Sequence, residues 1–264
     1  MTGPALLTDV VDGVATITFA RPEAMNSIDL ATKTELLGAL SETGADPSVR
    51  CVVLTGTGRA FSVGQDLKEH VTGLQTGTPD ELWATVPEHY NPIALALHTI
   101  DKPVVAALNG VAAGAGASIA FLADIRIVAA SAGFNLAFAN IALSCDTGCS
   151  WTLPRLVGTT RALDLLFNPR TISADEALQL GIATEVVADD RFTDRVRTVA
   201  AALAAGPTLA YASIRAAVSY AATRPLAESL AFESEMMKRT GSSADHRRAV
   251  EAFLAKQRPT FTGA

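Results

Sequence analysis

Two stretches rich in small residues decide the fold of this chain: Ala60-Phe61-Ser62-Val63-Gly64-Gln65-Asp66-Leu67 and Asn109-Gly110-Val111-Ala112-Ala113-Gly114-Ala115-Gly116-Ala117. Each is a turn that follows an apolar strand and runs into a helical pattern. Backbone N–H groups at such a turn are free to hold an anion or a polarised carbonyl oxygen. One glycine-rich turn alone could simply allow tight chain reversal or close packing. Two facing turns predict an oxyanion hole, a pair of donors that stabilises negative charge on a carbonyl oxygen.

Short apolar strands alternate with helical patterns on both sides of these turns. The sequence predicts strands at residues 14–19, 51–55, 104–108 and 125–129. Asp29 is placed as the N-cap of a helix that runs through Ala39. Residues 51–55 form a continuous apolar strand, as a sheet that is buried on both faces requires. This alternation predicts an α/β fold.

Composition narrows the class of protein. The chain has 264 residues, of which 49% are hydrophobic and 18% charged, enough for one large core or a core with a small appendage. No apolar run free of charge, glycine and proline reaches the ~20 residues that span a bilayer. A net charge of −6 argues against nucleic acid as the partner. We therefore expect a cytoplasmic protein with no nucleic-acid or membrane partner.

Metal binding is not expected from the cysteines or histidines. Cys51, Cys145 and Cys149 do not supply the four ligands of a zinc site, and the four histidines show no metal spacing. Buried or loop thiols in a reducing compartment are the simpler interpretation.

The last quarter of the chain shows only helical periodicity. We expect helices at 192–205, 207–222, 226–239 and 242–256, with Pro207 and Pro225 at helix starts. These alanine-rich helices have little core of their own to pack, so they should pack on the rest of the chain and on neighbouring subunits.

Ordered blocks along almost the whole chain resemble the crotonase, or enoyl-CoA hydratase/isomerase, superfamily. Besides the two turns, they are Arg21-Pro22-Glu23-Ala24-Met25-Asn26-Ser27, residues 101–107, 123–126, 153–158, 173–177 and 206–208, and the C-terminal block 252–261. The resemblance implies a spiral of ββα repeats rather than a doubly wound sheet. It also implies an acyl-CoA-binding core at residues 1–190, a helical oligomerisation region at 191–264, and a homotrimer or a dimer of trimers.

The same resemblance assigns the oxyanion donors and the ligand. The backbone N–H groups of Gln65 and Ala115 would hold the thioester oxygen of an acyl-CoA while carbon next to the thioester loses a proton. Coenzyme A thioester is then the substrate, and no permanently bound cofactor is expected. The family's CoA contacts match Ala24, Met25, Asp66, Leu67, Lys68 and Gly114, together with Phe253 and Lys256 from the same or an adjacent subunit. Lys256 could instead be a solvated cation at a helix end.

The acid and base groups depart from those of the family's two-glutamate hydratases. By register, those glutamates would stand at Ser118 and near Phe138. A serine hydroxyl without an adjacent base is no general base near neutral pH, and phenylalanine has no proton to exchange. Ser118 and Phe138 are thus expected in the substrate pocket, and plain two-glutamate hydration is not expected.

Asp146 is the remaining acid/base candidate. It lies in Leu143-Ser144-Cys145-Asp146-Thr147-Gly148-Cys149-Ser150-Trp151, which resembles the loop of ring-epoxide phenylacetyl-CoA isomerases, where an aspartate transfers the proton. An apolar acyl pocket would raise the pKa of this carboxyl towards neutrality. The alternative is that Asp146 only caps the following helix. Dehalogenases of the family also place an aspartate here, but they need an aromatic cage and a histidine base, and this chain offers Phe138 and no matching histidine.

Three functions follow from these residues. The first is isomerisation of an unsaturated acyl-CoA through an enolate. The alternatives are an enoyl-CoA hydratase with non-standard acid/base residues and a non-catalytic acyl-CoA-binding protein.

Residues 73–80 interrupt the periodicity and are predicted to be a mobile loop that covers the site. His89 and Tyr90 follow this loop and are expected at the surface rather than in the acyl tunnel.

Overall fold

The computed structural model describes residues 3–263. Its ten strands form two sheets. The larger sheet has the order β1-β2-β3-β5-β7-β10 and the smaller one the order β4-β6-β8-β9. The strands are β1 (Leu6–Val11), β2 (Val14–Phe19), β3 (Cys51–Gly56), β4 (Ala60–Ser62), β5 (Val104–Leu108), β6 (Val111–Ala113), β7 (Ile125–Ala129), β8 (Gly133–Asn135), β9 (Thr171–Ser173) and β10 (Glu185–Val187).

From β3 to β8, consecutive strands alternate between the two sheets. The pairs β3/β4, β5/β6 and β7/β8 each place their first strand in the larger sheet and their second in the smaller one. Strands β2, β3, β5, β7 and β10 pair in parallel, as do β4, β6 and β8. This arrangement confirms the α/β class and the spiral of ββα repeats.

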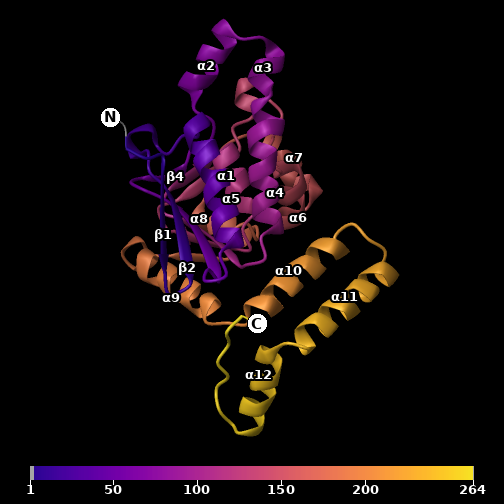
Figure 1. Ribbon diagram of the computed structural model, residues 1–264. Helices are drawn as coiled ribbons and strands as arrows, with labels where there is room; N and C mark the ends of the chain where they lie inside the picture. The colour runs from indigo at the N-terminus through magenta and orange to yellow at the C-terminus, as the bar shows by residue number, and fades with distance from the viewer. Residues whose placement is uncertain (1–2, 264) are drawn as a thin grey trace.

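The core lies on both faces of the larger sheet. All five residues of β5 are buried, as are the first four of β3, which is why these strands are continuously apolar. The α-helices of residues 3–263 are α1 (Leu30–Ala45), α2 (Leu67–Thr76), α3 (Pro79–Trp83), α4 (Asn91–Thr99), α5 (Ala115–Phe121), α6 (Cys149–Val157), α7 (Thr159–Phe167), α8 (Ala174–Gln179), α9 (Phe192–Ala204), α10 (Thr208–Ala221), α11 (Leu226–Gly241) and α12 (Ala244–Leu254). Helices α1, α5, α8 and α9 pack against strands of the two sheets (Figure 1).

Helix caps predicted from the sequence can be compared with those of the structure. The Asp29 carboxylate accepts from the Thr32 N–H at 2.9 Å and so caps α1, although that helix continues to Ala45. The prediction of a mobile loop at residues 73–80 is corrected by the structure, which places most of these residues in helices. They contain the end of α2 and the start of α3, and Thr78 and Glu81 form a reciprocal capping box at the start of α3.

The C-terminal helices differ in how they meet the core. Helix α9 packs against the larger sheet, whereas α10, α11 and α12 extend from the core as an arm (Figure 1). The Arg215 side chain joins α10 to the core, donating to Asp124 at 2.8 Å. The division of the chain at residue 190 stays a prediction. None of the helices in residues 3–263 is long and apolar enough to cross a membrane.

The two glycine-rich turns lie against each other because their glycines lack side chains. A Cβ at Gly110 would overlap the Arg59 carbonyl oxygen, and one at Gly116 would overlap that of Ser62. These glycines therefore let the chain around β6 and α5 approach the chain around β4. The spacing of the two turns depends on this contact.

Gly110→Ala should consequently destabilise the protein by about 1–3 kcal/mol, the usual cost of overpacking. Gly38→Ala is the matched control, because Gly38 lies inside α1 with no atom near its missing Cβ. That control should gain about 0.5–1 kcal/mol from helix propensity. Urea unfolding of both variants checks the prediction, and equal midpoints for the two would contradict it.

Candidate active site

The site forms where three strands of the smaller sheet end side by side. Because β4, β6 and β8 run parallel, their carboxyl ends meet at one edge. Gly64 and Gln65 follow β4, Gly114 and Ala115 follow β6, and Phe138 follows β8. The Gly114 N–H donates to the Asn135 carbonyl at 3.0 Å, which ties the second turn to the end of β8. Segments far apart in the sequence are thereby brought to one place.

Both turns use glycine at a left-handed position. Gly64 has φ +81° and Gly114 has φ +50°, values that side chains disfavour. A Cβ on Gly64 would stand 2.8 Å from the Ala113 carbonyl oxygen and 3.0 Å from the Ala115 nitrogen, so the two turns face each other closely. Within residues 3–263 the N–H groups of Gln65 and Ala115 donate to no protein acceptor. They are free to bind an oxygen atom.

A cavity of about 540 Å³ opens beside the two turns. Its wall is mainly apolar, with a few polar groups, as is usual for small-molecule sites. The residues that line it include Val63, Gln65, Leu67, Glu69, His70, Leu82, Trp83, Val86, Tyr90, Gly114, Ala115, Ala137, Phe138, Ile141, Leu143, Cys145 and Asp146. The predicted oxyanion donors and the predicted base thus line one cavity.

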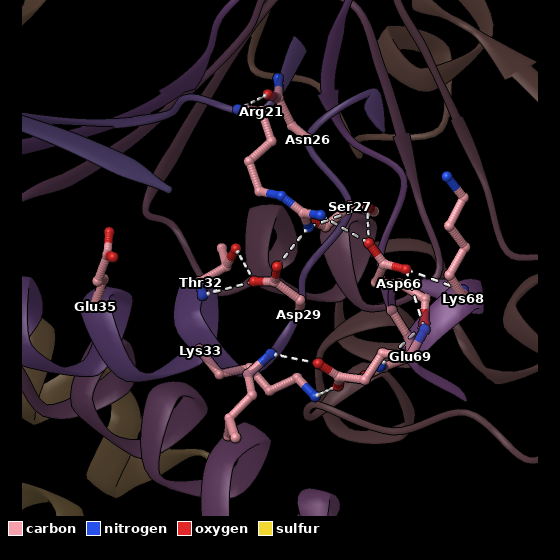
Figure 2. Close-up of polar contacts among 12 residues, drawn as sticks. Arg21, Asn26, Ser27, Asp29, Thr32, Lys33, Glu35, Asp66, Lys68 and Glu69 are labelled. Carbon is pink, nitrogen blue, oxygen red and sulfur yellow. Dashed lines mark hydrogen bonds and ion pairs between the residues drawn. The ribbon is translucent and has the colours of Figure 1, made fainter. Parts of the chain in front are cut away.

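A buried lysine anchors the first turn. Lys33 in α1 is almost fully buried, and its Nζ lies 2.9 Å from Glu69 Oε1, as Figure 2 shows. Glu69 also accepts from the Gln65 side-chain amide at 3.1 Å, and Gln65 Oε1 in turn accepts from the Tyr90 hydroxyl at 2.7 Å. This chain of contacts links α1, α2 and the segment before α4, and it holds the Gln65 side chain in one orientation.

The Asp66 carboxylate fixes the start of α2. It accepts from Ser27 Oγ at 2.8 Å, from Arg21 at 3.0 Å and from the N–H groups of Lys68 and Glu69 (Figure 2). Burial alone would raise the pKa of this carboxyl, but the hydrogen bonds from Ser27, Glu69 and Arg21 outweigh it, so the pKa lies below its usual value. Asp66 is therefore held ionised, as a structural anchor.

Asp146 differs from Asp66 in its surroundings. Its carboxylate lines the cavity and accepts from the Thr147 hydroxyl at 3.0 Å. Burial raises the pKa of Asp146 above its usual value, against the opposing effects of Thr147 and of the Lys33 charge. The N-cap of α6 is Gly148, and no side chain caps that helix. Asp146 therefore lines the cavity and does not cap α6.

Only some of the other predicted substrate contacts line the cavity. Leu67, Gly114 and Phe138 line it. Ala24 and Met25 are not among its lining residues, but the Met25 carbonyl accepts from the N–H of the lining residue Val63 at 3.3 Å. Lys68 is exposed, and its side chain extends away from the ion pairs in Figure 2. Ser118 is fully buried one turn into α5, where its hydroxyl donates to the Gly114 carbonyl at 3.2 Å.

Phe253 and Lys256 do not come near this cavity within one chain. Phe253 lies at the end of α12, 80% exposed, and Lys256 follows it. Figure 1 shows α12 at the opposite end of the molecule from α2 and α3, which border the cavity. A single chain therefore does not bring these two residues to the cavity.

Tyr90 and Glu69 are cavity residues that the sequence interpretation missed. Tyr90 is 1% exposed and lines the cavity, so its predicted surface position is wrong. Half-buried His89 is not part of that wall. Leu82, Val86 and Tyr90 all line the cavity at a spacing of four residues, a helical pattern that could have indicated a buried face. Across residues 3–263, His, Cys, Asp and Glu side chains form no group that could hold a metal ion.

Comparisons with known proteins agree with this geometry. The family model described as enoyl-CoA hydratase/isomerase matches residues 9–264. The chain is 40% identical to 1,2-epoxyphenylacetyl-CoA isomerase of Escherichia coli K12 over 98% of both proteins, and 42% identical to a probable enoyl-CoA hydratase of Rhodobacter capsulatus over 97% of this chain and 96% of that one.

A solved structure gives the same result for the fold. The crystal structure of a Mycobacterium abscessus protein described as an enoyl-CoA hydratase/isomerase superposes with a TM-score of 0.95 and 44% identity, covering 98% of this chain and 100% of the other. With the facing glycine-rich turns and the spiral of ββα repeats, these matches show that the chain belongs to the enoyl-CoA hydratase/isomerase family, whose members act on acyl-CoA.

Proposed function

We propose that this enzyme isomerises an unsaturated acyl-CoA by moving its double bond through an enolate. The Asp146 carboxylate removes a proton from the carbon next to the thioester of a 3-enoyl-CoA. The electrons move onto the thioester oxygen, which the N–H groups of Gln65 and Ala115 stabilise. Protonated Asp146 then returns the proton two carbons further along, and the double bond ends next to the thioester.

One observation carries this proposal: the half-buried Asp146 lines the same cavity as two free backbone donors. Burial shifts the pKa of Asp146 upward, towards the range in which a carboxyl can both accept and return a proton. The relative named 1,2-epoxyphenylacetyl-CoA isomerase supports an isomerase as well.

Hydration of an enoyl-CoA is the second candidate, because a second carboxylate lines the cavity. Glu69 reaches the wall from α2, and two carboxylates could together position and activate a water molecule. The Rhodobacter capsulatus relative is named a probable enoyl-CoA hydratase. We rank this candidate below isomerisation because both Glu69 oxygens already accept hydrogen bonds, from Lys33, from Gln65 and from the Leu30 N–H.

We further infer that the chain assembles as a trimer or as a dimer of trimers. Helices α10 to α12 carry large apolar side chains that are 45% to 80% exposed in one chain: Ile214, Val218, Leu226, Leu230, Met237, Val250, Phe253 and Leu254. Such a surface is typical of an interface rather than of a solvated face. In an assembly, Phe253 and Lys256 could reach the CoA of an adjacent subunit.

Asp146→Asn tests the proposed base. In deuterated water the wild type should exchange deuterium into a 3-enoyl-CoA next to the thioester, and the variant should do so about 10²–10⁴ times more slowly, the usual contribution of a positioned base. Asp80→Asn is the control, since Asp80 is exposed on α3, and its rate should equal that of wild type. Mass spectrometry of the recovered thioester gives both rates.

Other outcomes of that experiment are equally informative. Wild-type rates in Asp146→Asn would rule out Asp146 as the base. No exchange by wild type into 2-enoyl-, 3-enoyl- or aromatic acyl-CoAs, with binding retained, would favour a non-catalytic binding protein. Net addition of water that Glu69→Gln abolishes would favour the hydratase.

Asp146→Asn should also change how stability depends on pH. A carboxyl whose pKa is raised by folding destabilises the folded state at any pH where it is ionised. The variant should therefore be more stable than wild type at neutral pH. This difference should shrink as the pH falls through the folded-state pKa, and it should vanish below the unfolded value of about 3.9. Thermal melts across this range measure it, and a pH-independent difference would refute the linkage.

Val218→Asp tests the assembly. Val218 lies on α10 with 68% of its surface exposed, so a charge there should weaken an interface without disturbing the core. Sedimentation of wild type should show three or six chains per particle, and the variant should shift towards the single chain. Leu74→Asp, at an exposed position on α2, is the control and should sediment as wild type. A monomeric wild type at micromolar concentration would contradict the proposal.

A further inference from the structure

A second cavity, of about 500 Å³, lies between α10 and the core. Its wall comes from α4, α5, α6, β7 and α9 on one side and from α10, the first helix of the arm in Figure 1, on the other. Most of its lining side chains are apolar or aromatic, among them Phe121, Leu122, Trp151, Leu156, Leu203 and Tyr211. Within residues 3–263 it shares no lining residue with the cavity at the two turns. The proposed mechanism leaves it unused.

Arg126 in β7 is a buried cation in this wall. It is only 7% exposed, and its Nε and Nη1 donate to the backbone carbonyls of Ile182 and Ala123. Its Nη2 donates to no acceptor in the described residues, yet it is not among the fully buried atoms that lack a partner. Because Arg126 lines the cavity, we place the free end of its guanidinium there.

No carboxylate of the described chain forms an ion pair with Arg126. Asp124 is the acid of the cavity wall, but its oxygens accept from Arg215 Nε at 2.8 Å and from the Val104 N–H at 2.7 Å. Burial lowers the pKa of Arg126, and the Asp124 charge offsets this only in part. Buried charges in proteins are normally paired. Arg126 is therefore a buried cation that still has room for an anion.

The other polar groups of the wall add positive charge and hold its shape. Exposed Arg155 stacks on Trp151, with its guanidinium carbon 4.0 Å from the ring centroid. His98 and Ser219 share a hydrogen bond of 2.7 Å between Nε2 and Oγ, which ties α4 to α10 across the cavity. Three arginines and one aspartate line this cavity, although the whole chain carries a net charge of −6.

We propose that this cavity binds a small amphipathic carboxylate, such as a medium-chain fatty acid. Its carboxylate accepts from Arg126 Nη2 and neutralises the buried charge, a pairing for which the guanidinium is well suited. Its apolar chain lies along Trp151 and α10. The volume of about 500 Å³ falls in the range of small-molecule sites. This site does not depend on the reaction proposed above.

A carboxylate of a neighbouring chain is the other candidate partner. Ile214 and Val218, which we assign to the subunit interface, also line the cavity. One acidic side chain would fill only a small part of this space and would leave the apolar wall without contacts. A free carboxylate with an apolar chain fits both the charge and the volume, so we assign the cavity to such a ligand.

Trp151 gives this cavity its own optical signal. The chain has two tryptophans, and the other, Trp83, lines the cavity at the two turns. In Trp83→Phe, decanoate with a terminal bromine should quench the emission of Trp151 in a saturable manner. The matching bromodecanol should bind about 10 to 100 times more weakly, as expected when a hydrogen bond to a charged group is lost. Trp151→Phe reports entry into the other cavity separately.

Arg126→Met, made in Trp83→Phe, tests the cation. Methionine keeps an unbranched apolar side chain but has no charge, so this variant should bind the acid and the alcohol equally well. Arg197→Met is the matched control, because Arg197 is exposed on α9 and does not line the cavity. It should keep the preference for the acid. If Arg126→Met fails to fold by circular dichroism, the comparison of acid and alcohol in Trp83→Phe still decides the matter.

Four results would overturn the proposal. They are no saturable quenching of Trp151, equal affinity for acid and alcohol in Trp83→Phe, an unchanged preference for the acid in folded Arg126→Met, and quenching that appears only on dilution to single chains. The last of these would assign the cavity to a neighbouring chain.

Discussion

The close approach of the chain around β4 to the chain around β6 and α5 is the constraint on which the site depends. Parallel pairing of β4, β6 and β8 puts three strand ends at one edge. Gly110 and Gly116 lack the side chains that would keep the two backbones apart. The free N–H groups of Gln65 and Ala115 face one cavity only because this contact is made. In the proposed mechanism both donors belong to the backbone, so the fold itself would supply the electrostatic part of the chemistry.

Hydrogen bonds distinguish the carboxylates that stabilise the fold near the cavity from the carboxylate that we propose to react. Asp66 accepts from an arginine, a serine and two backbone N–H groups, and Glu69 from a buried lysine, an amide and a backbone N–H. These two hold α1 and α2 in place around the first turn. Asp146 accepts only from Thr147, and burial raises its pKa, so we propose that its proton is the one that moves. Environments that push the pKa values of neighbouring acids apart are a common basis for such assignments.

Much of this architecture could be predicted from the sequence because its signals are local. The apolar strands, the Asp29 cap and the glycine turns each follow from a few neighbouring residues. The hydrogen bond between Tyr90 and Gln65 could not be predicted in that way, because the two residues are 25 positions apart in the sequence and meet only in the folded chain. The sequence predicts a loop at residues 73–80 because Gly73 and Gly77 are typical of loops. The structure instead starts α3 there, with the capping box of Thr78 and Glu81.

Infrared spectroscopy tests directly whether the two turns polarise a thioester carbonyl, as we propose. A saturated acyl-CoA labelled with ¹³C at the thioester carbonyl would bind without reacting, and its stretching band can be isolated by isotope difference. Hydrogen bonds from Gln65 and Ala115 weaken the carbonyl double bond, so the account predicts a band at lower frequency in the complex than in water. A band at or above its frequency in water, with binding saturated by calorimetry, would contradict the oxyanion hole and the mechanism built on it.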